Sequence, residues 1–411
     1  MGMNDTPSGE RLHIGFFGRR NVGKSSLVNR VTGQDLAVVS EVKGTTTDPV
    51  RKAMELLPLG PVVIVDTPGM DDEGDLGELR VRKARQELNR VDAAVLVADA
   101  GEGLGPSEKV LLELFREKEI PYLIAFNKAD LLDREQQEAL GRTAEQEGKF
   151  LLVSARDNWR IRELKEEIGS LAGQKEQERH LVADLIKPSD FVVLVIPIDK
   201  AAPKGRLILP QQQAIRDILD AGARAVMVKE DELANTLAEL KKRPALVITD
   251  SQVFGKVAAA TPPEIPLTSF SILFARYKGN LFQAAAGAAE LKKLRTGDRV
   301  LIAEGCTHHR QCGDIGTEKL PAMIRKYTCA KPEFVFTSGR EFPEDLSGFR
   351  LVIHCGGCTL NEREMQYRLK TAADQGVPMT NYGIAIACMQ GILRRSVAMF
   401  PAVQALLEED S

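Results

Sequence analysis

The chain has 411 residues, of which 43% are hydrophobic and 27% charged, and its formal net charge is −3. This length suffices for two or three domains, and the near-neutral charge argues against bulk binding to nucleic acid or anionic membranes. No apolar run approaches the roughly 18 to 20 residues that span a bilayer, and the polar start lacks the apolar core of a signal peptide. We therefore expect a cytoplasmic protein with neither membrane nor nucleic-acid partners.

Residues 11 to about 172 alternate short apolar runs with helical patterns. The runs are rich in Val, Ile and Leu and end in loop residues, which is typical of buried parallel strands. They lie at 12–18, 61–69, 93–100, 121–130 and 149–155. The polar segment 173–178 then marks a linker.

The first strand leads into a phosphate-binding loop. Residues 18–25, GRRNVGKS, match the pattern G-x-x-x-x-G-K-S/T between a strand and a helix. Glycines let backbone N–H groups approach phosphate oxygens, and the helix N-terminus favours the anion. We predict that Lys24 bridges the β- and γ-phosphates in catalysis and that Ser25 holds Mg²⁺.

Three further motifs follow, each at a strand end. In DTPG, Asp66 can reach Mg²⁺ through water and Gly69 can sense the γ-phosphate. In NKAD, the Asp130 carboxylate can accept two hydrogen bonds from guanine, which adenine cannot supply. The order of the motifs indicates GTP. The predicted nucleotide-binding residues are Gly18, Asn21, Val22, Gly23, Lys24, Ser25, Ser26, Asp66, Asn127, Lys128, Asp130, Ser154 and Ala155.

Residues 44–48, GTTTD, lie where the first switch belongs. Here the chain resembles the tRNA-modifying and ribosome-assembly branch of the translation-factor-related GTPases. That resemblance implies that Thr46 completes the Mg²⁺ shell and that Asn21 holds K⁺ against the phosphates. The alternative for residues 44–48 is a plain polar loop, and the alternative for Asn21 is a hydrogen bond that stabilises the phosphate loop. Met70 stands where many GTPases have a water-orienting glutamine, so we expect slow GTP hydrolysis stimulated by K⁺.

Two further blocks alternate strands with helices. Apolar runs predict strands at 190–199, 223–230, 243–251, 298–305, 333–339, 349–357 and 377–383. Prolines near residue 265 suggest a boundary, and no short-period repeat is visible. The predicted fold is α/β, with a P-loop GTPase domain followed by two α/β domains with mainly parallel sheets. The predicted domain limits are 1–172, 179–264 and 265–411.

All six cysteines lie beyond position 300. Cys306 and His308 follow one predicted strand, and His354, Cys355 and Cys358 follow another. If both strands are parallel, the two groups share the carboxyl edge of one sheet, where α/β proteins place their sites. The two glycines between Cys355 and Cys358 permit a tight turn that lets both sulfurs face one centre.

Two kinds of metal centre suit these ligands. Zinc would take three thiolates and one histidine in a closed tetrahedral site. A [4Fe–4S] cluster would take the three thiolates and leave one iron for another ligand. The spacing does not separate the two. Cys312, Cys329 and Cys388 fall outside the pattern and are interpreted as core or incidental thiols.

A GTPase of this branch followed by CxH and HCxxC resembles the HydF family of [FeFe]-hydrogenase maturation GTPases. The similarity extends over the chain, including PKGRLILP at 203–210 and LVIHCGGC at 351–358. It implies a middle dimerisation domain and a cluster-binding domain. It places a [4Fe–4S] cluster on three matching cysteines and makes two histidines candidate iron ligands. These are Cys306, Cys355 and Cys358, with His308 and His354.

The resemblance also implies a scaffold or carrier role. A homodimer would hold a di-iron precursor, built with radical-SAM maturases, and pass it to apo-[FeFe]-hydrogenase. Two other readings are kept open: a GTPase acting on RNA, and a zinc-stabilised regulatory GTPase that signals through its switch loops.

Overall fold

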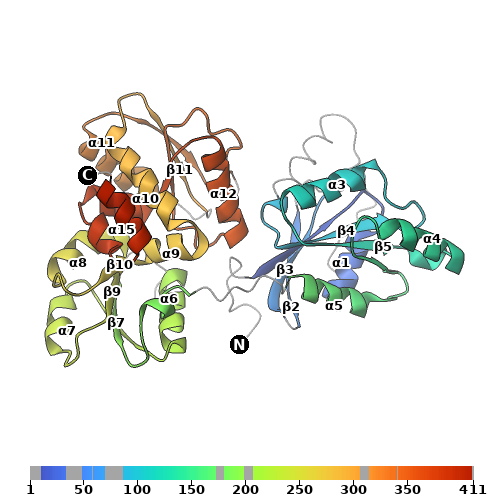
Figure 1. Ribbon diagram of the computed structural model, residues 1–411, viewed down its shortest axis with the longest axis horizontal. Coiled ribbons are helices and arrows are strands. Elements are labelled where there is room, and N and C mark those ends of the chain that lie inside the picture. The colour runs from blue at the N-terminus through green and yellow to red at the C-terminus, as the bar shows by residue number, and fades with distance from the viewer. Residues whose placement is uncertain are drawn as a thin grey trace. The chain divides into compact units, whose positions relative to one another are not determined.

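The computed structural model describes residues 11–33, 49–57, 59–69, 87–172, 180–198, 207–305, 314–339 and 341–409. The chain divides into two compact units, Met1–Gln177 and Glu178–Ser411 (Figure 1). Both contain strands and helices, and every pairing between strands of the described residues is parallel except one. The predicted α/β class with mainly parallel sheets is therefore confirmed. Among the described residues, no helix is both long and apolar enough to cross a membrane.

The first unit is built on a six-stranded sheet in the order β2-β3-β1-β4-β5-β6. Its strands are β1 (Leu12–Phe17), β2 (Val50–Leu56), β3 (Gly60–Asp66), β4 (Ala93–Asp99), β5 (Tyr122–Asn127) and β6 (Phe150–Leu152). Strand β2 was not predicted. It pairs antiparallel with β3 at the sheet edge. Several of its residues are polar, so it lacks the apolar run that marks the buried strands.

Helices cover both faces of this sheet. They are α1 (Lys24–Thr32), α3 (Pro106–Glu117), α4 (Arg134–Ala144) and α5 (Ile161–Ala172). Apolar side chains of α1 and α5 pack on one face, and those of α3 and α4 pack on the other. A sheet covered on both sides requires strands that are apolar on both faces, as these sequences are.

The second unit contains two four-stranded parallel sheets, in the orders β10-β9-β7-β8 and β12-β11-β13-β14. The first has β7 (Phe191–Val195), β8 (Arg224–Val228), β9 (Leu246–Thr249) and β10 (Leu267–Ser269). The second has β11 (Arg299–Ala303), β12 (Glu333–Thr337), β13 (Leu351–His354) and β14 (Met379–Asn381). The predicted boundary near 265 falls just before β10, which pairs with β9 and so belongs to the first of these sheets.

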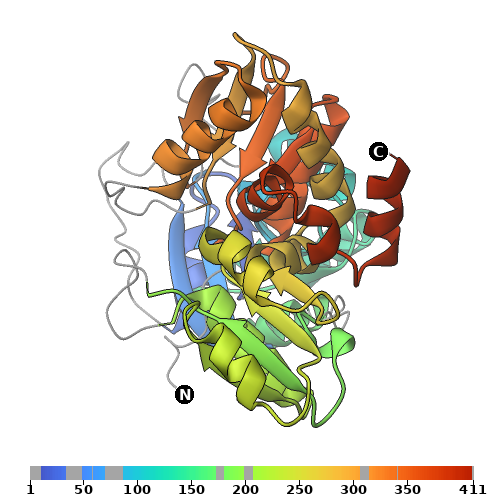
Figure 2. The same ribbon diagram turned by 90° about the vertical axis from the view of Figure 1, so that its left-hand side faces the viewer.

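The helices of the second unit connect and cover these sheets. They are α6 (Leu209–Asp220), α7 (Leu233–Glu239), α8 (Phe254–Ala260), α9 (Phe270–Lys278), α10 (Leu281–Ala289), α11 (Leu320–Thr328), α12 (Glu362–Asp374), α13 (Tyr382–Met389), α14 (Leu393–Ser396) and α15 (Pro401–Glu409). The two sheets lie at opposite ends of the unit with α9 between them (Figure 1, Figure 2).

The two sheets of this unit have the same topology. Read from β10 and from β14, each runs fourth, third, first and second strand in chain order. The sequences agree where the fourth strand meets its helix: residues 266–281 and 378–393 are identical at six positions. Ser269 and Asn381 occupy an equivalent position at which the residues differ, and each caps the helix that follows. The second unit is therefore a long-period repeat of one βα arrangement, which the sequence alone did not reveal.

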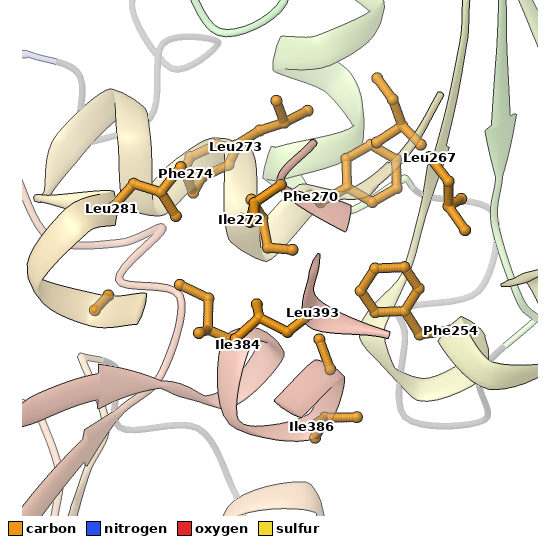
Figure 3. Close-up of a cluster of buried hydrophobic side chains, with 14 of the residues drawn as sticks. Phe254, Leu267, Phe270, Ile272, Leu273, Phe274, Leu281, Ile384, Ile386 and Leu393 are labelled. Atoms are coloured by element: carbon orange, nitrogen blue, oxygen red, sulfur yellow. The ribbon is translucent and has the colours of Figure 1, made fainter. Parts of the chain in front are cut away.

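The two halves share one hydrophobic core. Side chains from α8, β10, α9, α10, α13 and α14 meet in it (Figure 3). Polar contacts fix the joint: Asn381 Nδ2 donates to the Ser271 carbonyl at 3.0 Å, and the Ser251 and Ser271 hydroxyls lie 3.0 Å apart. A side chain at Gly383 would place its Cβ 2.3 Å from Ser271 Cβ, so the closeness of this contact depends on glycine.

Helix α10 also approaches a strand closely through a glycine. A Cβ added at Gly287 would lie 2.3 Å from the carbonyl oxygen of Met379 in β14. We expect Gly287→Ala to lower the free energy of unfolding of the second unit by about 1–3 kcal/mol, because backbone must shift to admit the methyl group. Gln283→Ala, at an exposed position of the same helix, is the control. Chemical denaturation measures both; a Gly287→Ala chain at least as stable as the unaltered one would contradict the expectation.

Candidate functional site

The phosphate-binding loop lies between β1 and α1. Gly18 has φ 153° and Gly23 has φ 81°. A Cβ at Gly18 would lie 2.2 Å from the Val97 carbonyl oxygen, and one at Gly23 would lie 2.3 Å from Asn127 Nδ2. Side chains are thus excluded from both positions. Lys24 then begins α1, which places the helix N-terminus at the loop.

The carboxylate of Asp66 lies beside the two loop residues predicted to contact phosphate and Mg²⁺. Ser25 Oγ donates to Asp66 Oδ2 at 2.6 Å, and Lys24 Nζ lies 3.8 Å from Asp66 Oδ1. The Oδ1 atom is buried and accepts no hydrogen bond from the described residues. Mg²⁺ prefers oxygen ligands and neutralises carboxylates, so a hydroxyl beside a buried, incompletely satisfied carboxylate fits this ion.

Asn127 connects the three nucleotide-binding loops. Its Nδ2 donates to the Val22 carbonyl at 2.9 Å, and its Oδ1 accepts from the Ala155 N–H at 3.0 Å. The neighbouring Lys128 pairs with Asp99 at 2.6 Å. The motifs are far apart in sequence, yet one amide side chain sets the spacing between the phosphate loop and the loop at residues 154–155.

The remaining predicted nucleotide residues are placed as follows. Asn21 is exposed with φ 63°, Val22 and Ser154 are buried, and Ser26 and Asp130 are exposed. Gly69 lies against the phosphate loop, because a Cβ there would be 2.9 Å from the Arg20 nitrogen. Thr46 and Met70 lie outside the described residues.

The two cysteine segments leave the same edge of one sheet. Strands β11 and β13 are parallel neighbours, with Ala303 opposite His354. The Cys355 N–H donates to the Ala303 carbonyl at 2.8 Å. Gly305 lies against the loop after β13: its N–H is 3.0 Å from Cys355 Sγ, and its carbonyl accepts from Thr359 Oγ1 at 3.2 Å. The next residue in sequence is Cys306, which lies outside the described residues together with His308 and Cys312.

A tight turn presents Cys355. The sulfur of Cys355 accepts N–H groups from Gly305 and from Gly357, the latter at 3.4 Å. Gly357 has φ 64°, and a Cβ there would lie 2.7 Å from Met365 Sδ. The predicted role of the glycines in this turn therefore has a steric cause at Gly357.

His354 lies fully buried behind this turn. Its Nδ1 is 2.7 Å from the Cys355 carbonyl oxygen, and its Nε2 is 2.8 Å from Arg368 Nη1. Burial and the neighbouring guanidinium lower the pKa of His354 to about 3. The imidazole is therefore neutral at physiological pH.

Two buried cations support the loop, and neither was singled out from the sequence. Arg368 bonds Glu364 four residues earlier on α12. Lys278 donates to the carbonyls of Cys358 and Leu360, at 3.3 and 3.1 Å. Burial raises the pKa of the Cys358 thiol, and the charge of Lys278 opposes that shift.

Tyr382 and Asn381 lie near the same edge. Tyr382 O–H donates to Glu304 at 3.3 Å. Burial, with Cys355 and Glu304 nearby, raises the pKa of Tyr382. A cavity of about 20 Å³, lined in part by His354, Cys355 and Asn381, borders the loop.

The described part of the chain does not by itself form a complete metal centre. No group of three or more His, Cys, Asp or Glu side chains within it is placed to hold a metal ion. Of the described cysteines outside the predicted motif, Cys329 is exposed and Cys388 is partly buried. The predicted metal set therefore stays a prediction, with Cys355 and Cys358 placed at the edge and Cys306 one residue beyond Gly305.

The nucleotide-binding part resembles curated GTPases. It is 32% identical over 173 residues to the tRNA modification GTPase MnmE of Dechloromonas aromatica, covering 42% of this chain and 37% of that protein. Over a longer alignment of 267 residues, the chain is 28% identical to GTPase Era of Carboxydothermus hydrogenoformans, covering 54% of this chain and 88% of Era. A crystal structure of an Aquifex aeolicus Era variant aligns with a TM-score of 0.37 and 20% identity, over 52% of this chain and 91% of that one.

Three family models match successive parts of the chain. The model described as a 50S ribosome-binding GTPase matches residues 13–128. The hydrogen maturase F dimerization domain matches residues 181–279, and the hydrogen maturase F tetramerization domain matches residues 282–399. The last two meet just after α9, at the junction between the two halves of the second unit. With a GTPase domain ahead of both maturase domains, the chain belongs to the hydrogen maturase F (HydF) family.

Proposed function

We propose that this protein is a GTPase and an iron–sulfur scaffold in the maturation of [FeFe]-hydrogenase. It binds GTP with Mg²⁺ in the first unit and a [4Fe–4S] cluster on Cys306, Cys355 and Cys358 in the second. As a homodimer or larger oligomer it receives a di-iron precursor made with radical-SAM maturases and delivers it to the apo-hydrogenase. Membership in the family supports a role in hydrogenase maturation. The position of Cys355 and Cys358 at the carboxyl edge of the sheet supports the cluster.

One observation carries the proposal. The N–H of Gly305 lies 3.0 Å from the sulfur of Cys355. Consecutive Cα atoms are about 3.8 Å apart, so the chain length allows the residue after Gly305 to approach the sulfur of Cys355. That residue is Cys306. Two segments separated by a long stretch of chain thus bring Cys355 into contact with Gly305, the residue that precedes Cys306 in the sequence.

The donor set fits an iron–sulfur cluster. Cys355 already receives two backbone N–H groups, a common environment for cluster sulfurs, since such hydrogen bonds tune the reduction potential. Lys278 places a positive charge near Cys358 and offsets part of the negative charge of thiolates. When bound, a cluster with one iron not held by cysteine supplies a coordination position for a partner's ligand. Its position at a sheet edge suits transfer between proteins.

The nucleotide end has its own distinctive residue. Asn21 is exposed at the rim of the phosphate loop, in the left-handed backbone region that asparagine tolerates. A K⁺ ion held there would stabilise negative charge on the phosphates. In other GTPases an arginine finger stabilises this charge in the transition state. GTP hydrolysis in this protein is then slow and dependent on K⁺.

GTP hydrolysis is expected to be at least about tenfold faster in KCl than in NaCl, a small part of the 10³–10⁵ that a full arginine finger supplies. Asn21→Gly should abolish this difference. Glycine keeps the positive φ while removing the side chain, so GTP affinity should be retained. Arg20→Ala, at the neighbouring exposed position, is the control. Equal rates in the two salts for the unaltered chain would exclude the K⁺ site.

Anaerobic reconstitution with iron and sulfide should give a brown protein with about four irons per chain, the content of one [4Fe–4S] cluster. Changing Cys306, Cys355 or Cys358 to serine should abolish the characteristic EPR signal of the reduced cluster and most of the iron. Cys329→Ser, at an exposed thiol outside the motif, should leave both unchanged. A colourless protein that contains one zinc per chain would contradict the proposal.

A further inference from the structure

We propose that His354 is a positioning residue for the cysteine loop rather than a ligand of iron. Its ring holds the carbonyl group of Cys355 and is itself held by Arg368. This role deepens the proposed function and rests on it, because the loop that His354 fixes is the one proposed to carry the cluster.

The hydrogen-bond partners of the ring define its tautomer. A guanidinium has donors and no acceptor, so the 2.8 Å contact makes His354 Nε2 the acceptor of a proton from Arg368. The proton of the neutral ring is therefore on Nδ1, which donates to the Cys355 carbonyl at 2.7 Å. Both nitrogens are in use, and the one lone pair that could bind a metal faces Arg368.

Arg368 is not free to release this lone pair. It is 1% exposed, and it also donates to Glu364 at 2.9 Å and to the Gly339 carbonyl at 2.8 Å. Its guanidinium lies 5.0 Å from the ring centre of Phe342. Iron could reach His354 Nε2 only by breaking a buried hydrogen bond to a charged group. Hydrogen bonds to charged groups are stronger than those between neutral groups, and a buried donor left without a partner keeps the full cost of its desolvation.

The consequence for Cys355 is a fixed main chain on both sides. Its N–H donates to the Ala303 carbonyl, and its own carbonyl is held by His354. The main chain that carries the sulfur is thus fixed before any metal binds. Histidine suits this position because it has two ring nitrogens. One bonds the Cys355 carbonyl in the loop, and the other bonds the Arg368 side chain on α12.

Two substitutions separate this role from ligation. His354→Asn keeps an N–H close to the position of Nδ1 and can still hold the Cys355 carbonyl, but it has no ring nitrogen for iron. His354→Leu removes both functions. His180→Asn, an exposed histidine of the same unit, is the matched control. If His354→Leu does not fold, Arg368→Lys is tested in its place. The ammonium group of lysine lacks the planar donors with which arginine bonds His354, Glu364 and Gly339 at once, so the support of His354 is weakened.

The first readout is spectroscopic and uses the full-length chain reconstituted with iron and sulfide. With ¹⁵N-histidine incorporated, pulsed EPR of the reduced unaltered chain should show no nitrogen bound directly to iron through His354. His354→Asn should keep the same g values and lose iron to a chelator within about twofold of the unaltered rate. His354→Leu should lose it about 10–100-fold faster, the usual effect of removing a group that orients a metal ligand.

The second readout needs no iron. Phenylarsine oxide binds closely spaced thiols, so its affinity for the metal-free chain reports how well the cysteines are presented. We expect His354→Asn to bind it as the unaltered chain does and His354→Leu to bind it about tenfold more weakly. A strong nitrogen coupling that His354→Asn abolishes, or a His354→Leu chain unaltered in both assays, would overturn the role. If the unaltered chain takes up no cluster, the proposed function fails, while the arsenical measurement still decides the role of His354.

Discussion

The parallel pairing of β11 with β13 is the constraint on which the cysteine site depends. Apolar residues of both strands, from Val300 to Ile302 and from Leu351 to Ile353, are fully buried. Because both strands are covered on two faces, a shift of register would expose part of the core. Ala303 therefore stays opposite His354, and the residues that follow each strand leave the sheet side by side. The contact between Gly305 and Cys355 is a consequence of this register.

The same arrangement carries different loops in the two halves of the second unit. After β9, Asp250 accepts from the Gln252 N–H and starts a short 3-10 helix. After β13, the equivalent position is Cys355, followed by a turn through Gly357. The strands, their order and the capped helix after the fourth strand are common to both. Chemistry thus resides in the loop placed on the scaffold, as is general among α/β folds.

Much of the nucleotide site could be predicted because its chemistry requires particular residues at particular spacings. Gly18, Gly23 and Asn127 are examples, and the structure gives each a steric or hydrogen-bonding reason. Arg368 and Lys278 could not be found in this way. A charged residue on a helix usually marks a solvated face, and only tertiary structure shows that these two satisfy buried carbonyls and a ring nitrogen.

Two edge strands, β2 and β10, and the repeat were missed for related reasons. The polar residues of β2 hide its pairing with β3, and β10 has three residues in a proline-rich stretch. The six identities shared by residues 266–281 and 378–393 are spread over a long interval. They gain meaning only when the order of strands in both sheets is known, because periodicity within a short window cannot detect a repeat of this length.

Because the Arg368–Glu364 pair is buried, the cysteine loop that it supports is less sensitive to ionic strength than exposed ion pairs of the first unit. At 0.15 M salt, charges in solvent are screened over about 8 Å, whereas buried pairs are screened far less. Arg368 and Glu364 are 1% and 4% exposed, in contrast to 92% and 63% for Arg162 and Glu166 in the first unit. The concentration of potassium chloride can therefore be raised to test the proposed K⁺ site without loosening the hydrogen bonds that hold the cysteine loop.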